Sequence, residues 1–132
     1  MLLTIRDETA VGSVTNELTL DVLSESLSIR ELIRSRIYQE VQDYNLRQRQ
    51  GEATFRGLIT PGDAERTPNG VRLRQPREVD WKEQFEKACD AFMHNGFFIL
   101  IDDRQAESLD ETITLRHDTT VSFVKLVPLV GG

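Results

Sequence analysis

The amino-acid sequence predicts an α+β domain in which a mixed sheet packs on a helix. Residues 2–8 and 17–23 alternate apolar and polar side chains, with the period of two that half-buried strands show. Residues 29–44 and 81–93 instead repeat apolar side chains every three or four positions, as amphipathic helices do. From residue 97 onward the sequence returns to strand-like runs. A chain of 132 residues is long enough for one domain with one hydrophobic core.

The two N-terminal strands are expected to form a hairpin, because turn-forming residues 12–16 separate them. A helix over residues 29–44 follows. Ser28 and Glu31 have the spacing of a capping box, whose side chains satisfy backbone N–H groups at a helix start. The apolar positions of this helix lie on one stripe: Ile29, Leu32, Ile33, Ile37, Val41 and Tyr44.

Residues 45–79 lose this periodicity and are rich in glycine, proline and arginine. We interpret them as an insertion or long loop within the domain, since they could not bury a core of their own. Short alternations at 54–59 and 71–74 indicate at most a marginal hairpin. The arginines from Arg47 to Arg77 are either a docking surface for an acidic partner or the solvated side of a loop.

A second helix is expected after Asp80, its predicted N-cap, with Asn95-Gly96 as its C-terminal stop. Its apolar stripe contains Trp81, Phe85, Ala88, Cys89, Phe92 and Met93. We expect Cys89 to be a small buried side chain rather than a nucleophile, because reactive cysteines need an accessible, electropositive site.

The last third predicts three strands. Residues 97–101 are apolar without alternation, as in a strand covered on both faces. Residues 112–115 and 120–126 flank the turn-forming pair His117-Asp118 and suggest a hairpin. The final strand then runs into a tail, residues 127–132.

An N-terminal hairpin, a long helix and a sheet ending in Gly131-Gly132 resemble the β-grasp family of ubiquitin. They are also similar to the bacterial sulfur carriers, namely the small subunit of molybdopterin synthase and the thiamine sulfur carrier. The likeness lies in residues 1–5, 16–33 and 98–132. Val121-Ser122-Phe123, leading to Val130-Gly131-Gly132, is similar to the end of the sulfur carriers in particular.

The sequence departs from that family pattern at residues 45–95, an insertion that carries the extra helix before the third strand. The resemblance therefore implies a single ubiquitin-like β-grasp domain, residues 1–132, with this insertion and an extended tail at 127–132.

The resemblance also implies that an E1-like activating enzyme uses ATP to adenylate the carboxylate of Gly132. A thiol, or sulfur, then attacks the adenylate. Glycine suits Gly131 and Gly132 because it has no Cβ to obstruct a narrow crevice. Leu129 and Val130 would bind in that crevice as apolar anchors, and Pro128 would keep the tail extended.

The diglycine could also be without function. A random chain ends in two glycines roughly once in two hundred cases, and terminal glycines can be cloning remnants. Gly132 is either the encoded end or one exposed by processing. The strand that leads into the diglycine, together with the hairpin and helix, favours the functional interpretation.

The strands at 97–101 and 121–127 carry large apolar residues on both faces, and the first helix covers only one face. Either the second helix and the insertion cover the other face, with a residual patch, or that face is exposed for a partner. Phe98, Leu100 and Phe123 are the candidate partner-binding residues of the sheet.

Composition excludes several other classes. A net charge of −6 argues against a nucleic-acid binder, and no run approaches the ~20 apolar residues of a membrane span. A single cysteine agrees with a cytoplasmic location. The two histidines, His94 and His117, are far apart, so no metal site is expected. Asp102-Asp103 and Asp110-Glu111 are interpreted as solvated turn formers rather than catalytic carboxylates.

Three hypotheses follow. The first is a non-enzymatic protein modifier with no bound cofactor. Its partners would be the activating enzyme, a conjugating enzyme, a deconjugating peptidase and an unidentified target. The second is a sulfur carrier that bears a thiocarboxylate on Gly132 for cofactor biosynthesis. The third is a β-grasp interaction domain in which the diglycine has no role. The large insertion favours the modifier, because the sulfur carriers are compact.

Overall fold

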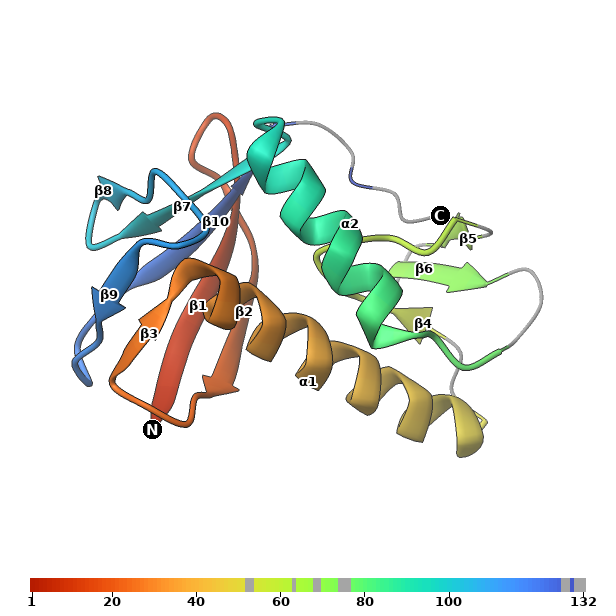
Figure 1. The fold of residues 1–132 in the computed structure, drawn as a ribbon. Coiled ribbons are helices and arrows are strands. Elements are labelled where there is room, and N and C mark those ends of the chain that lie inside the picture. The colour runs from red at the N-terminus through yellow and green to blue at the C-terminus, as the bar shows by residue number, and fades with distance from the viewer. Residues whose placement is uncertain (52–53, 63, 68–69, 74–76, 127–128, 130–132) are drawn as a thin grey trace.

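The structure is a computed structural model that describes residues 1–51, 54–62, 64–67, 70–73, 77–126 and 129. Its main sheet has five strands in the order β2-β1-β10-β7-β8 (Figure 1). β1 and β10 run parallel at the centre, and the other neighbours are antiparallel. The strands are β1 (Leu2–Thr9), β2 (Val14–Asp21), β7 (Phe97–Ile101), β8 (Arg104–Gln105) and β10 (Val121–Lys125). The predicted α+β class, a mixed sheet packed on a helix, is confirmed.

The N-terminal hairpin forms where alternation predicted it. Leu3 and Ile5 of β1 are buried, whereas Leu2 and Thr4, which alternate with them along the strand, are exposed. The turn contains Gly12 with φ +87°, a conformation that side chains with a Cβ rarely adopt. β2 begins at Val14, earlier than predicted, because the turn is shorter than the run of turn-forming residues.

Helix α1 (Ile29–Arg49) starts at the predicted cap, where the Glu31 N–H donates to Ser28 Oγ at 3.1 Å. It ends five residues later than the apolar stripe predicted, because polar contacts support its last turns. Asn45 is buried and bonds to Val79 through both ends of its amide, at 2.8 and 3.0 Å. Arg49 Nε donates to Glu78 at 2.7 Å.

Helix α2 (Trp81–Met93) also begins and ends as predicted. The Asp80 side chain accepts from the Lys82 N–H at 3.0 Å, and Asn95 has a positive φ of 60° just beyond the last turn. Ala88, Cys89 and Phe92 are buried. Met93 is 60% exposed, so it does not belong to the buried stripe.

The insertion contains a small second sheet rather than a marginal hairpin (Figure 1). Its strands lie in the order β4 (Thr54–Phe55), β6 (Gly70–Leu73) and β5 (Ala64–Thr67). Phe55 packs edge-on against Tyr44 of α1, with ring centroids 5.2 Å apart. Phe55, Leu58, Ile59 and Leu73 belong to the same buried cluster as the main sheet. The insertion therefore shares the core of the domain.

The predicted hairpin around His117-Asp118 is wrong. β9 (Thr112–Thr114) pairs with β3 (Ser26–Ser28), the short strand before α1, and not with β10. Both edges of β10 are already occupied, one by β1 and the other by β7. A third strand has no free edge there, so β9 and β3 form a separate two-stranded sheet.

Both helices pack on the same face of the main sheet. Arg36 of α1 lies over the Phe123 ring at 4.5 Å from its centroid. Phe92 of α2 packs against Phe97 at 5.8 Å, and Phe97 stacks on Phe123 at 5.8 Å. The expectation that α2 covers the opposite face is therefore wrong.

Replacing Leu32 with alanine is expected to lower the free energy of unfolding by roughly 2–5 kcal/mol, because Leu32 is fully buried in the core. Leu46→Ala on the same helix is the matched control: Leu46 is 53% exposed, and its truncation should cost less than about 0.5 kcal/mol. Urea unfolding followed by circular dichroism measures both. Equal effects at the two sites would contradict this assignment of the buried face.

Candidate functional site

The candidate site is the segment that follows β10. The Leu126 N–H donates to the carbonyl of Gly96 at 3.0 Å, which extends the pairing of β10 with β7 by one residue. Of the five tail residues that the sequence singled out, only Leu129 is described by the structure. The other four lie outside the described residues: Pro128, Val130, Gly131 and Gly132.

Leu129 is seated on its own domain. Its side chain is 8% exposed, and its carbonyl accepts from the Thr60 N–H at 2.8 Å. On the other side, a Cβ built on Gly96 would lie 3.1 Å from Leu129 Cδ2, so the glycine allows the close approach. The resemblance to the ubiquitin family implies that Leu129 binds in a partner's crevice. Binding there would require Leu129 to leave this seat.

The three consecutive residues 58–60 connect the insertion to three different parts of the chain. The Leu58 N–H donates to Glu40 Oε2 of α1 at 3.0 Å. The Ile59 carbonyl accepts from Gln84 Nε2 of α2 at 2.7 Å, in a buried bond. Thr60 donates to Leu129, as described above. Residues 58–60 of the insertion therefore connect α1 and α2 to Leu129 of the tail.

Gly57 explains how this segment comes so close to α1. A Cβ at Gly57 would lie 2.6 Å from Glu40 Oε2 and 2.7 Å from the Phe55 ring. Contacts this short do not occur for real Cβ atoms, so a larger residue would displace the loop from Glu40. The turn-forming glycine of the sequence is thus required by close packing.

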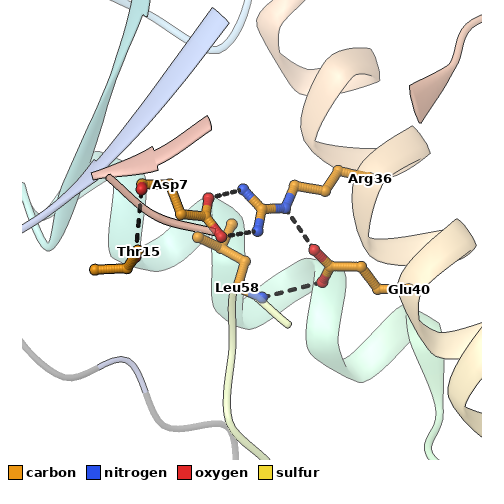
Figure 2. A network of polar contacts seen from close by, with 5 residues as sticks. All are labelled: Asp7, Thr15, Arg36, Glu40 and Leu58. Atoms are coloured by element: carbon orange, nitrogen blue, oxygen red, sulfur yellow. Dashed lines mark hydrogen bonds and ion pairs between the residues drawn. The ribbon is translucent and has the colours of Figure 1, made fainter. Parts of the chain in front are cut away.

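A buried ion-pair network lies beneath this loop (Figure 2). Arg36 is completely buried and donates to both carboxylate oxygens of Asp7, at 2.5 and 2.7 Å. Its Nε donates to Glu40 Oε1 at 2.5 Å, and the other oxygen of Glu40 accepts from Leu58. The Thr15 hydroxyl donates to the Asp7 carbonyl at 3.2 Å. One guanidinium thus joins β1, α1 and the insertion.

Electrostatics keep this guanidinium charged. Burial on its own would lower the pKa of Arg36, but Glu40 and Asp7 more than compensate, and the net effect raises the pKa above its ordinary value. The network was not predicted from the sequence, although the sequence contains a signal for it. Arg36 and Glu40 fall in phase with the apolar stripe of the helix, and Asp7 is in phase with Leu3 and Ile5.

The candidate partner-binding residues of the sheet lie on opposite faces. Phe123 is completely buried against Phe97 and Arg36, so its assignment to an exposed surface is wrong. Phe98 and Leu100 are half-buried and lie on the face away from the helices, since the alternation of β7 turns Phe97 and Ile99 towards the core. Only these two of the three can contact a partner in this structure.

A cleft of about 590 Å³ lies between the end of α2 and residues 105–110. Phe92, Phe97 and Leu109 contribute apolar surface, and Arg30 pairs with Asp110 at 3.2 Å on its lining. The residues that line it include neither cysteine nor histidine. The lining is mixed, because polar side chains such as Asn95, Gln105 and Ser108 lie beside the apolar ones.

The remaining chemical candidates have structural partners. Cys89 is buried as predicted, and burial raises the pKa of its thiol against the opposing charge of Arg30, which makes it a poorer nucleophile. Asp102 and Asp103 form a tight turn with φ of 48° and 69°, so they are confirmed as turn formers. Hydrogen bonds from the Glu107 N–H and Arg104 hold the pKa of Glu111 below its ordinary value.

Two arginines of the insertion region also have structural roles. Arg47 pairs with Asp43 at 2.9 Å and donates to the Thr54 carbonyl at 3.1 Å, while Arg49 pairs with Glu78. Within the described part of the chain, no three His, Cys, Asp or Glu side chains are grouped to hold a metal ion. No helix among the described residues is long and apolar enough to cross a bilayer.

Comparison with models of protein families, with curated proteins and with solved structures gives no match.

Replacing Asp7 with alanine is expected to lower the free energy of unfolding by about 3–5 kcal/mol, since it leaves a buried guanidinium with one carboxylate fewer. Arg6→Ala, one position earlier, is the matched control. Arg6 pairs with Glu17 at 3.4 Å on the surface, where a pair contributes less than about 1 kcal/mol.

The triple variant Asp7→Leu/Arg36→Met/Glu40→Gln removes the three charges of the network together, and its glutamine can still accept from the Leu58 N–H, so it should recover much of the stability lost in Asp7→Ala. Thermal and urea unfolding measure all three proteins. A cost for Asp7→Ala no larger than that of Arg6→Ala would contradict a structural role for the network.

Proposed function

We propose that this chain is a β-grasp, ubiquitin-like protein modifier whose Gly132 carboxylate is activated and joined to a target. The observation that carries the proposal is the path of the chain at its end. β10 is the central strand of the sheet, parallel to β1, and the diglycine follows it in sequence after residues 126–130.

The β-grasp assignment is supported by strand order and connection. A β1–β2 hairpin leads into α1, which packs across one face of a sheet ordered β2-β1-β10-β7-β8. The first and last strands of the main sheet, β1 and β10, are adjacent and parallel. The insertion and α2 are additions between α1 and β7 and leave this order intact.

The proposed chemistry takes place on the partner enzyme. The Gly132 carboxylate displaces pyrophosphate from ATP and forms an acyl-adenylate. A cysteine thiolate of the activating enzyme then displaces AMP and forms a thioester. Gly131 and Gly132 have no Cβ to obstruct attack on the carboxylate, and β10, which precedes the tail, is paired at both edges.

A sulfur carrier is the second candidate. The observation that favours it is the sequence of β10 and its continuation, Val121-Ser122-Phe123 followed by Val130-Gly131-Gly132. In that case a sulfide ion (HS⁻) attacks the adenylate, AMP leaves, and Gly132 retains a thiocarboxylate. A stable mass increase equal to the exchange of one oxygen for sulfur would identify this product, whereas a modifier gives a thiol-sensitive thioester or an amide.

Deletion of Gly131 and Gly132 is expected to abolish ATP–pyrophosphate exchange by the cognate activating enzyme. The new terminal carboxylate would be shorter by two residues and crowded by the β-branched Val130. The free energy of unfolding should stay almost unchanged, within a few tenths of a kcal/mol. Gly132→Val preserves the length and tests the crowding alone.

The control is Leu32→Ala, which should lose exchange only in proportion to the fraction unfolded. Full exchange activity in the truncated protein would remove the proposal. A loss of stability equal to the loss of activity would show instead that the diglycine has a structural role.

The distribution of lysines predicts single attachments rather than long chains of the modifier. The chain has three lysines, Lys82, Lys87 and Lys125. The first two are exposed on α2, and Lys125 is half-buried within β10. After reconstituted conjugation, gel electrophoresis should show mainly targets that carry one copy of this protein at each attachment site. Extended ladders that disappear in Lys82→Arg/Lys87→Arg would contradict this prediction.

A further inference from the structure

The seat of Leu129 is built from two segments that are distant in sequence. The Thr60 N–H of the insertion binds its carbonyl, and Gly96, after α2, accommodates its side chain. Thr60 is held in turn by its neighbours: Ile59 is bonded to Gln84 of α2, and Leu58 to Glu40 of α1. Leu129 thus contacts a segment that hydrogen bonds hold to both helices.

We propose that this seat is a latch that controls access to the reactive terminus, an inference that rests on the proposed function. Leu129 cannot have its side chain buried against Gly96 and its carbonyl bound to Thr60 while it also binds in a partner's crevice. Release of Leu129 from this seat would supply the partner with an apolar anchor.

The latch acts through the population of the released form. A partner that binds only released tail has its affinity reduced by the fraction of molecules in which the latch is open. A change that weakens the latch should therefore lower KM for the activating enzyme and leave kcat unchanged, because the chemistry at Gly132 is not altered.

Thr60→Pro tests the latch, because proline has no N–H to donate to Leu129. Thr60→Ala keeps the donor and is the matched control. Loss of the bond should raise the open fraction, and so lower KM, by roughly tenfold, whereas the alanine variant should behave like the parent protein. Gly96→Ala disturbs the seat from the opposite side, since its Cβ would crowd Leu129 Cδ2, and it should lower KM in the same direction.

Amide hydrogen exchange tests the latch without any activating enzyme. The Thr60 amide should be protected in the full chain and should exchange at least about tenfold faster in a chain that ends at Pro128, with the amides of β1 and β10 unaffected. Equal exchange of the Thr60 amide in both chains would overturn the latch. If exchange reveals the latch but the activating enzyme ignores Gly132, the proposed function fails and the seat is structural. If Gly132 is activated and all variants have the same KM as the parent protein, the latch is wrong but the proposed function stands.

Discussion

The buried guanidinium of Arg36 is the constraint on which the rest of this structure depends. A charge without contact with water destabilises a fold unless every donor finds an acceptor. Here Asp7 and Glu40 supply those acceptors, and the ring of Phe123 covers the guanidinium. Since Asp7 belongs to β1 and Glu40 also binds the insertion, satisfying one charge fixes the relative positions of three segments. A shift in any of them would leave a buried charge incompletely paired.

The same network gives the insertion a defined place. From Glu40 the bonds continue through residues 58–60, to Gln84 of α2 and to Leu129 near the end of the chain. The segment that departs most from the β-grasp pattern is therefore the segment that contacts the tail. This arrangement connects the two unusual features of the chain, its long insertion and the diglycine that follows β10, in one physical account.

Much of the fold could be predicted from the sequence because burial of one face imposes a period. Alternation located β1 and β2, and the capped stripes located both helices. Alternation identifies faces but not partners, so it could not reveal that β9 pairs with β3. The charged residues in phase with the core were visible, yet Asp7 and Arg36 are 29 positions apart and only the fold brings them together. The seat of Leu129 could not be predicted, because Thr60 and Gly96, which form it, lie in segments without a periodic pattern of apolar residues.

The most direct test of the central claim is mass spectrometry of proteins from the cells that make this chain. Trypsin cleaves after Lys125, so a conjugated Gly132 would leave residues 126–132 attached to a lysine of another protein. The account predicts target peptides that carry this seven-residue remnant through an amide bond to Gly132. Recovery of residues 126–132 only as the free acid, in cells where the activating enzyme is present and active, would contradict it.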